Sequence, residues 1–293
     1  MLGFPRKTIG TEIERNGGGP MIDRETCMSR LAELDLLPDD TVAVLCVGSV
    51  ARGWSNDTSD LNFYVVSLSP WQREGMAFKT APLDHPVVPV HVLRVDGRTW
   101  KLKHWTVGQA DQMLAKVGHD RFDGHSGQPA DLVAPVLAEI EELFVERLES
   151  AVPVLGDEWL AAYRETARRS AFRDFLTERS AAAFHGHAEA AKDRMSADDT
   201  AGAVLCARQA FGFAVDAFLD SRGNHGNFTP KWRARRFMET GSESLSFEDY
   251  WAFETMHGFD SVAPESWVRR VLAAGEELLA EIRDTRSGSL QPT

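Results

Sequence analysis

The chain has 293 residues, enough for one large or two small domains, and 43% of them are hydrophobic, which suffices to build a core. Its 23 glycines and 13 prolines are close to average usage, which excludes a collagen-like or low-complexity protein. The formal net charge of −12 repels polyanions, so we expect no extended nucleic-acid partner.

The N-terminal residues 1–20 end in Gly17-Gly18-Gly19-Pro20 and contain no apolar run of the kind found in signal peptides. We expect a flexible N-terminal arm here. The chain has no run of about 18 apolar residues, which argues against a membrane-embedded protein. Its three widely spaced cysteines fit a reducing compartment and form no zinc-binding pattern. These features together predict a cytoplasmic protein without a membrane partner.

Residues 21–125 have the pattern of an α/β domain. A helix over 22–37 is followed by β-branched runs that predict strands over 42–47, 61–67, 87–95 and 99–105. The last two runs flank Asp96-Gly97, a dipeptide typical of a tight hairpin turn. The sequence therefore predicts a mixed sheet that contains at least one antiparallel hairpin.

Residues 126–293 have helical periodicity throughout and predict an all-α bundle. Apolar stripes run over 132–148, 159–183, 204–219 and 267–282. Gly223 follows the third stripe at the position of a helix C-cap. Within the first stripe we expect a solvated acidic face formed by Glu139, Glu141, Glu142 and Glu146, or, as the alternative, a general base among them.

The segment between the first two expected strands carries the most chemical information. Gly48 and Ser49 end the first strand, ten residues follow, and Asp60 opens the next strand with Asn62 two positions later. Strand alternation places residues 60 and 62 on one face, so both side chains can point at one bound group. Glycine at position 48 lets a phosphate approach the backbone, where Ser49 and the amides of a following helix start can hold it.

This arrangement, with the neighbouring Ala51-Arg52-Gly53-Trp54, resembles the small-molecule nucleotidyltransferases of the DNA polymerase β superfamily, of the aminoglycoside and lincosamide type. The resemblance implies an α/β nucleotidyltransferase domain, built on a mixed sheet with a hairpin, followed by the helical bundle. It also implies that Gly48, Ser49 and Arg52 bind the nucleotide. Asp60 and Asn62 take the places of the catalytic residues and metal ligands.

A second region of the bundle resembles the same family. The stretch from Ala217 to Arg233 looks like a helix end, a glycine-rich turn and the Lys-Trp start of another helix. Thr229 can cap that helix and Pro230 suits its first turn. A lysine there reaches the nucleotide's phosphates in the resembling enzymes, which implies this role for Lys231. The alternative is an exposed basic face formed by Lys231, Arg233, Arg235 and Arg236.

The chain departs from the family at the metal site. Nucleotidyl transfer in this superfamily uses two metal ions held by three carboxylates. Asn62 replaces the second carboxylate, and Lys101 and Lys103 stand on the strand that usually carries the third. Alternation puts both lysines on one face and His104 on the other; all three are candidates for lining a ligand cleft. We therefore expect at most one Mg²⁺, held by Asp60 and Asn62.

Two functions remain open at this point. The first is transfer of a nucleoside monophosphate from an NTP such as ATP to a hydroxyl of a small molecule, for which the acidic balance favours a cationic acceptor such as an aminoglycoside antibiotic. The second is a pseudo-nucleotidyltransferase that has lost the two-metal site and binds a ligand, or performs metal-independent chemistry in a biosynthetic pathway. The sequence does not indicate the acceptor or the oligomeric state.

Overall fold

The computed structural model describes residues 23–122, 137–226 and 230–288, so the expected N-terminal arm lies outside the described residues. The chain forms two compact units. The sheet unit comprises residues 1–112 and 147–164, and the helical unit comprises residues 113–146 and 165–293. The expected division near residue 125 differs from this one, because the chain returns to the sheet unit after residue 146.

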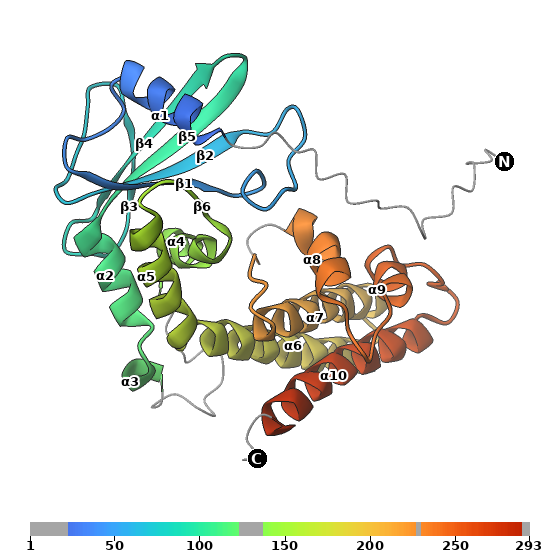
Figure 1. Ribbon diagram of the computed structural model, residues 1–293. Helices are drawn as coiled ribbons and strands as arrows, with labels where there is room; N and C mark the ends of the chain where they lie inside the picture. Colours follow the sequence, from blue (N-terminus) through green and yellow to red (C-terminus); the bar gives the residue numbers. More distant parts are fainter. Residues whose placement is uncertain (1–22, 123–136, 227–229, 289–293) are drawn as a thin grey trace. The chain divides into compact units, whose positions relative to one another are not determined.

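A six-stranded sheet organises the first unit (Figure 1), with the strand order β3-β4-β5-β2-β1-β6. Neighbouring strands are antiparallel, except that β2 and β5 are parallel. The predicted mixed sheet in an α/β unit is therefore confirmed. Its elements are α1 (Arg24–Glu33), β1 (Thr41–Val47), β2 (Leu61–Ser67), β3 (Ala77–Thr80), β4 (Val87–Val95), β5 (Arg98–Thr106) and β6 (Val152–Leu155), with α2 (Val107–Lys116) and α5 (Asp157–Arg169) each crossing a unit boundary.

The predicted hairpin joins β4 to β5. Asp96 and Gly97 have φ values of 46° and 80°, and this left-handed pair matches the twist of the flanking strands. Two strands were missed, β3 and β6, because four residues are too few to establish a period of two. The prediction that residues 126–293 are helical throughout was wrong at β6, a short edge strand that tolerates Pro153.

Helix α1 packs against one face of this sheet. Asp23 caps the helix by accepting a hydrogen bond from the Glu25 amide at 3.2 Å. Leu31 is buried in a cluster with Cys46 and Phe63 on the sheet. Since side chains alternate along each strand, the residues between these core positions lie on the opposite face, and that face carries the polar groups described below.

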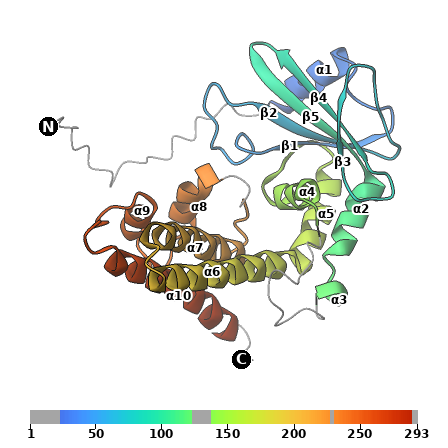
Figure 2. The same ribbon diagram turned by 180° about the vertical axis from the view of Figure 1, so that it is seen from behind.

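The second unit is helical in its described residues. Helices α6, α7 and α10 lie side by side in both views (Figures 1 and 2). This part of the chain confirms the predicted all-α region. Its elements are α3 (His119–Phe122), α4 (Glu139–Ser150, which crosses into the sheet unit), α6 (Phe172–Ser196), α7 (Thr200–Ser221), η1 (Pro230–Trp232), α8 (Arg233–Thr240), α9 (Phe247–Glu254) and α10 (Pro264–Gly288).

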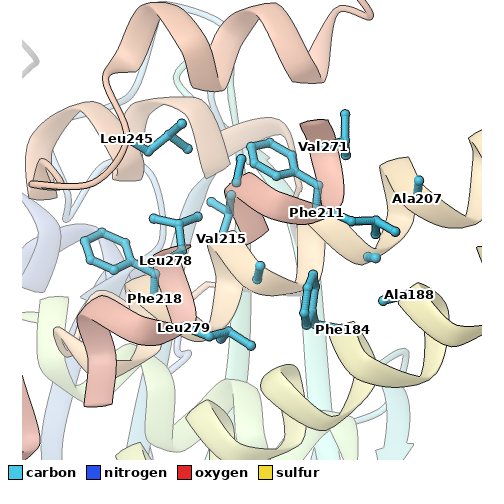
Figure 3. Packing of buried hydrophobic residues seen from close by; sticks show 14 of the residues in the cluster. Phe184, Ala188, Ala207, Phe211, Val215, Phe218, Leu245, Val271, Leu278 and Leu279 are labelled. Atoms are coloured by element: carbon cyan, nitrogen blue, oxygen red, sulfur yellow. The ribbon is translucent and has the colours of Figure 1, made fainter. Parts of the chain in front are cut away.

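Aromatic and aliphatic side chains from α6, α7 and α10 form the core of the helical unit (Figure 3), among them Phe184, Phe211 and Leu278. Helix α7 supplies the predicted apolar stripe, and Gly223 follows it with a φ of 77°. Within the described residues α7 is the one helix whose length and composition would allow a membrane span, but 67% of its most apolar window is buried inside the protein. Its place in this core accounts for its hydropathy.

Two details of the helical pattern differ from the sequence analysis. The stripe over 159–183 is two helices, α5 and α6, which are separated at Ser170, where the hydroxyl donates to the Ala167 carbonyl and accepts from the Phe172 amide. The expected solvated acidic face was wrong, since three of its four residues are buried and two form ion pairs. Lys116 binds Glu141 at 2.7 Å, and Arg179 binds Glu142 at 2.6 Å.

Substitution of two helix-interior glycines by alanine should change the stability in opposite directions. A Cβ on Gly275 of α10 would overlap the buried Phe184 ring, so Gly275→Ala should lower the free energy of unfolding by about 1–3 kcal/mol. A Cβ on Gly186 of α6 would meet nothing within 4 Å, so Gly186→Ala should raise it by up to about 1 kcal/mol. Urea denaturation of both variants measures the difference, and equal shifts would contradict the packing described.

Candidate functional site

A tight loop follows β1. Gly48 has a φ of 82°, a conformation that favours glycine. Its carbonyl accepts the Arg52 amide at 3.1 Å, and the Ser49 carbonyl accepts the Trp54 amide at 2.8 Å. The expected helical turn is present as a single turn and does not continue into a helix. The Arg52 guanidinium lies 4.8 Å from the centroid of the Trp54 ring, within the same loop.

The loop's second half positions Asp60. The Asn56 side-chain oxygen accepts hydrogen bonds from the Thr58 amide at 3.2 Å and from the Ser59 hydroxyl at 2.8 Å. Arg98 on β5 donates to the Ser59 carbonyl at 3.0 Å. These bonds fix the backbone immediately before Asp60, so the carboxylate stands at the entrance to β2.

The pairing of β2 with its neighbours brings several predicted residues together. Asn62 is the register partner of Val47 on one side and of Lys101 on the other. Its amide nitrogen would be 3.7 Å from a Cβ on Gly48, so it lies beside the glycine turn. The Lys101 ammonium forms an ion pair with Asp60, with 2.5 Å between Nζ and Oδ2. The structure thus groups Gly48, Asp60, Asn62 and Lys101.

Further cations lie on the same face of the sheet, around Tyr64. The Lys103 ammonium is 5.9 Å from the centroid of the Tyr64 ring, and the Arg147 guanidinium is 5.8 Å from it. Arg147 also donates to the Tyr64 hydroxyl at 3.4 Å. Arg147 is not predictable from the sequence, because this residue is 83 positions from Tyr64 and no spacing pattern connects the two.

The donor set does not fit the two Mg²⁺ ions that the resemblance implies. Hard cations need anionic oxygen ligands. Asp60 offers one carboxylate, already paired with Lys101, and Asn62 offers a neutral amide. Among the described residues no three His, Cys, Asp or Glu side chains are grouped in a way that could hold a metal ion. The Lys101 ammonium, 2.5 Å from Oδ2 of Asp60, would also repel a divalent cation placed at this carboxylate.

His104 lies apart from the other cleft candidates. It is buried on the opposite face of β5, where its ring centroid is 4.4 Å from that of Trp71. Neither ring nitrogen has a hydrogen-bond partner among the described residues. Burial, with a smaller contribution from His91, lowers the pKa of His104 to about 3, so the ring is neutral at physiological pH.

Lys231 belongs to the helical unit. It lies in η1, directly before α8, and its ammonium is 5.2 Å from the centroid of the Trp232 ring. Thr229, the expected cap, falls outside the described residues. The alternative of an exposed basic face was wrong for Arg233 and Arg236, because both are withdrawn from solvent and form ion pairs with Asp216.

Comparisons with known proteins find a likeness to solved structures. No protein-family model and no curated protein matches the sequence. Among solved structures, the chain is similar to a nucleotidyltransferase-like protein from Exiguobacterium sibiricum 255-15, with 11% identity and a TM-score of 0.44. The match covers 89% of this chain and 74% of that chain. At this degree of likeness the interpretation of the site rests on the geometry given above.

The buried ring of His104 predicts a pH-dependent loss of stability. Unfolding restores the ordinary pKa near 6.5, so between about pH 6.5 and pH 3 the unfolded chain binds a proton that the folded chain does not. Protonation of His104 in the unfolded chain should therefore lower the free energy of unfolding by about 2 kcal/mol at pH 5 relative to pH 7. His104→Met should reduce the pH 7-to-5 loss by that amount in urea denaturation. An unchanged pH slope would contradict a neutral buried ring.

The described side chains around Asp60 lack the carboxylates that a metal pair needs, so we expect that adding carboxylates there creates a metal site. Asn62→Asp combined with Lys101→Glu would place three carboxylates together, so Mn²⁺ affinity in calorimetry should rise about tenfold or more over the wild type. The control joins Asn62→Asp to Lys79→Glu on exposed β3, which has the same net charge. A wild type that already binds Mn²⁺ as tightly, or a control that gains as much, would refute the interpretation.

Proposed function

We propose that the protein binds a phosphate-bearing small molecule, of the nucleotide class, on the β2–β5 face by means of cationic side chains instead of a pair of divalent ions. The observation that carries the proposal is the 2.5 Å ion pair between Lys101 and Asp60. The resemblance implies that related transferases hold metal between carboxylates at this position. This proposal corresponds to the second function left open by the sequence, a pseudo-nucleotidyltransferase that has lost the two-metal site and binds a ligand.

The charge of Lys101 supports this proposal. An ammonium group donates up to three hydrogen bonds and binds phosphate oxygens as a point charge. The same ammonium repels a divalent cation placed within about 4 Å. A face that pairs its Asp with a Lys is therefore better suited to an anion than to Mg²⁺.

The neighbouring groups support the same choice. The Gly48 turn lies beside Asn62, where a phosphate can approach the backbone closely, and Ser49 is the next residue of this turn. Lys103 and Arg147 add two cations that the Tyr64 ring holds in position. Both are partly exposed, so a ligand can reach them.

The competing function is transfer of a nucleoside monophosphate to a hydroxyl of a small molecule, including a cationic one. It requires Asp60 as a metal ligand, and so requires the ion pair to open. The two functions predict opposite effects when the negative charge of Asp60 is removed, which makes that change decisive.

Asp60→Asn is expected to strengthen ATP binding in EDTA by about threefold to tenfold, because a negative charge close to the ligand is lost and Lys101 is released. Lys101→Met should weaken it about tenfold, and the control Lys79→Met on exposed β3 should leave it unchanged. Isothermal titration with ATP and with tripolyphosphate, in EDTA and in Mg²⁺, measures these affinities. Tripolyphosphate separates recognition of phosphate from recognition of the base.

The same titrations can refute the proposal. Binding that requires Mg²⁺ and disappears in Asp60→Asn would favour the transferase, as would Mg²⁺-dependent labelling of an aminoglycoside by labelled ATP. A wild type that binds neither ATP nor tripolyphosphate in EDTA or Mg²⁺ would exclude both functions at this face.

A further inference from the structure

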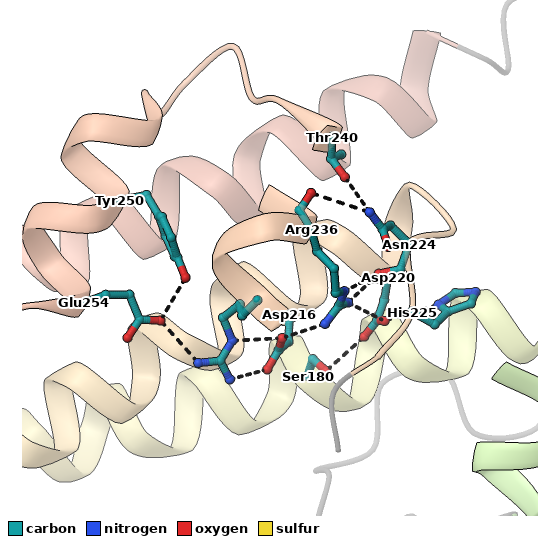
Figure 4. A network of polar contacts seen from close by, with 10 residues as sticks. Ser180, Asp216, Asp220, Asn224, His225, Arg236, Thr240, Tyr250 and Glu254 are labelled. Carbon is teal, nitrogen blue, oxygen red and sulfur yellow. Dashed lines mark hydrogen bonds and ion pairs between the residues drawn. The ribbon is translucent and has the colours of Figure 1, made fainter. Parts of the chain in front are cut away.

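Two carboxylates, Asp216 and Asp220, are buried one turn apart in the apolar C-terminal half of helix α7. Burial of a carboxylate is costly unless it is paired and hydrogen-bonded. The Arg233 guanidinium donates to Asp216 from Nε at 3.0 Å and from Nη2 at 2.7 Å. Figure 4 shows this network extending along α7 from Glu254 to His225, whose Nδ1 is 3.2 Å from Asp220. The network fixes the side chains at one end of a pocket.

A pocket of about 840 Å³ lies against this network within the described part of the helical unit. This volume falls within the range typical of small-molecule sites. Residues from α6, α7, α8, α9 and η1 form its walls. The polar wall includes three arginines, Arg179, Arg208 and Arg233, together with Gln209 and the two carboxylates Asp216 and Glu254, and the apolar wall includes Leu205 and Phe213.

The charges around this pocket are arranged asymmetrically. The Arg179 side chain is 35% exposed while its partner Glu142 is 3% exposed. Arg208 is 46% exposed and lies 3.9 Å from Glu254, which is 19% exposed. In both pairs the guanidinium is the group that solvent reaches and the carboxylate is shielded behind it. The more exposed member of each of these two pairs is therefore the cation.

The guanidinium groups also have the hydrogen-bonding capacity for a second anion. Each carries five N–H donors, so pairing with one carboxylate does not exhaust it. Arg179 is held by two bonds to Glu142, at 2.6 Å and 2.7 Å. Arg208 is held by a bond from Nη2 to the Glu254 carbonyl at 3.1 Å. Both groups are thereby positioned before any ligand arrives, which reduces the entropy cost of binding.

The rest of the pocket suits the apolar part of a ligand. Leu205 is a large exposed hydrophobic residue on α7, two helical turns before Phe213. The Phe213 ring stacks on His187 of α6, with 5.2 Å between centroids. Gly212 leaves room for the Arg233 guanidinium in the pocket wall, since a Cβ there would lie 3.1 Å from the Arg233 Nη1 atom.

We propose that this pocket of the helical unit binds a small organic oxyanion, a carboxylate or phosphate attached to an apolar body, with Arg179 and Arg208 as its anion-binding residues. The site is separate in its residues from the β2–β5 face and does not depend on the function proposed there. The proposed ligand is an anion, whereas the overall acidity of the chain favours a cationic acceptor.

Three fluorinated probes of one shape test the proposal: 4-fluorobenzoate, 4-fluorophenyl phosphate and 4-fluorobenzylamine, each titrated with the full chain by ¹⁹F NMR. At least one of the anions should bind, and the ammonium compound should not. The comparison of the two anions distinguishes a carboxylate ligand from a phosphate ligand. Arg208→Gln should weaken the bound anion about tenfold or more, because a charged hydrogen-bond donor is lost from a partly exposed position.

Matched variants separate this pocket from other causes. Arg173→Gln removes an exposed arginine of α6 outside the pocket and should leave the titration unchanged, as should Lys79→Met on exposed β3 of the sheet. Leu205→Asp keeps the arginines but adds a negative charge at the wall, and should weaken the anion by a similar factor. The proposal is overturned if neither anion binds, if the amine binds equally well, if Arg208→Gln has no effect, or if either control loses binding.

Discussion

The parallel pairing of β2 with β5 is the constraint on which the sheet's chemistry depends. It aligns Asn62 with Lys101 across two strands that are far apart in sequence. In this register a lysine side chain reaches Asp60 at the start of β2. A shift of one residue would present the buried Leu102 to Asp60 and turn Lys101 into the core. The hydrophobic alternation that buries Phe63 and Leu102 thereby fixes the ion pair as well.

The helical unit obeys a different constraint, which is the pairing of buried charge. Asp216 and Asp220 interrupt an apolar helix, and they require partners from outside α7. The arginines of α8 satisfy Asp216 from across the unit. Glu254 of α9 completes the set by accepting from Arg233 at 3.2 Å. The network therefore determines how α8 and α9 dock on α7, in addition to the apolar packing of Figure 3.

The sequence was sufficient for the features that depend on local pattern. The four longer strands, the Asp96-Gly97 turn and the end of α7 at Gly223 follow from alternation, turn chemistry and helix capping. The opposition of His104 to Lys101 follows from strand alternation. Features that depend on contacts distant in sequence were missed, such as Arg147 beside Tyr64 and the burial of Glu142 by Arg179. The pairing of Asp216 and Asp220 could have been predicted, since two carboxylates within an apolar stripe indicate cationic or hydrogen-bonding partners on other elements.

The place of β6 in the sheet has a consequence for how the protein is made. Residues 152–155 supply the outer neighbour of β1, more than a hundred residues after it. During synthesis, β1 therefore leaves the ribosome with an unpaired edge, and this edge stays open to other chains until β6 is available. A fragment that stops near residue 125 would keep the edge permanently. The sheet unit is thus one compact unit built from two separate stretches of the chain. An intact sheet requires residues both before and after the segment 113–146, which belongs to the helical unit.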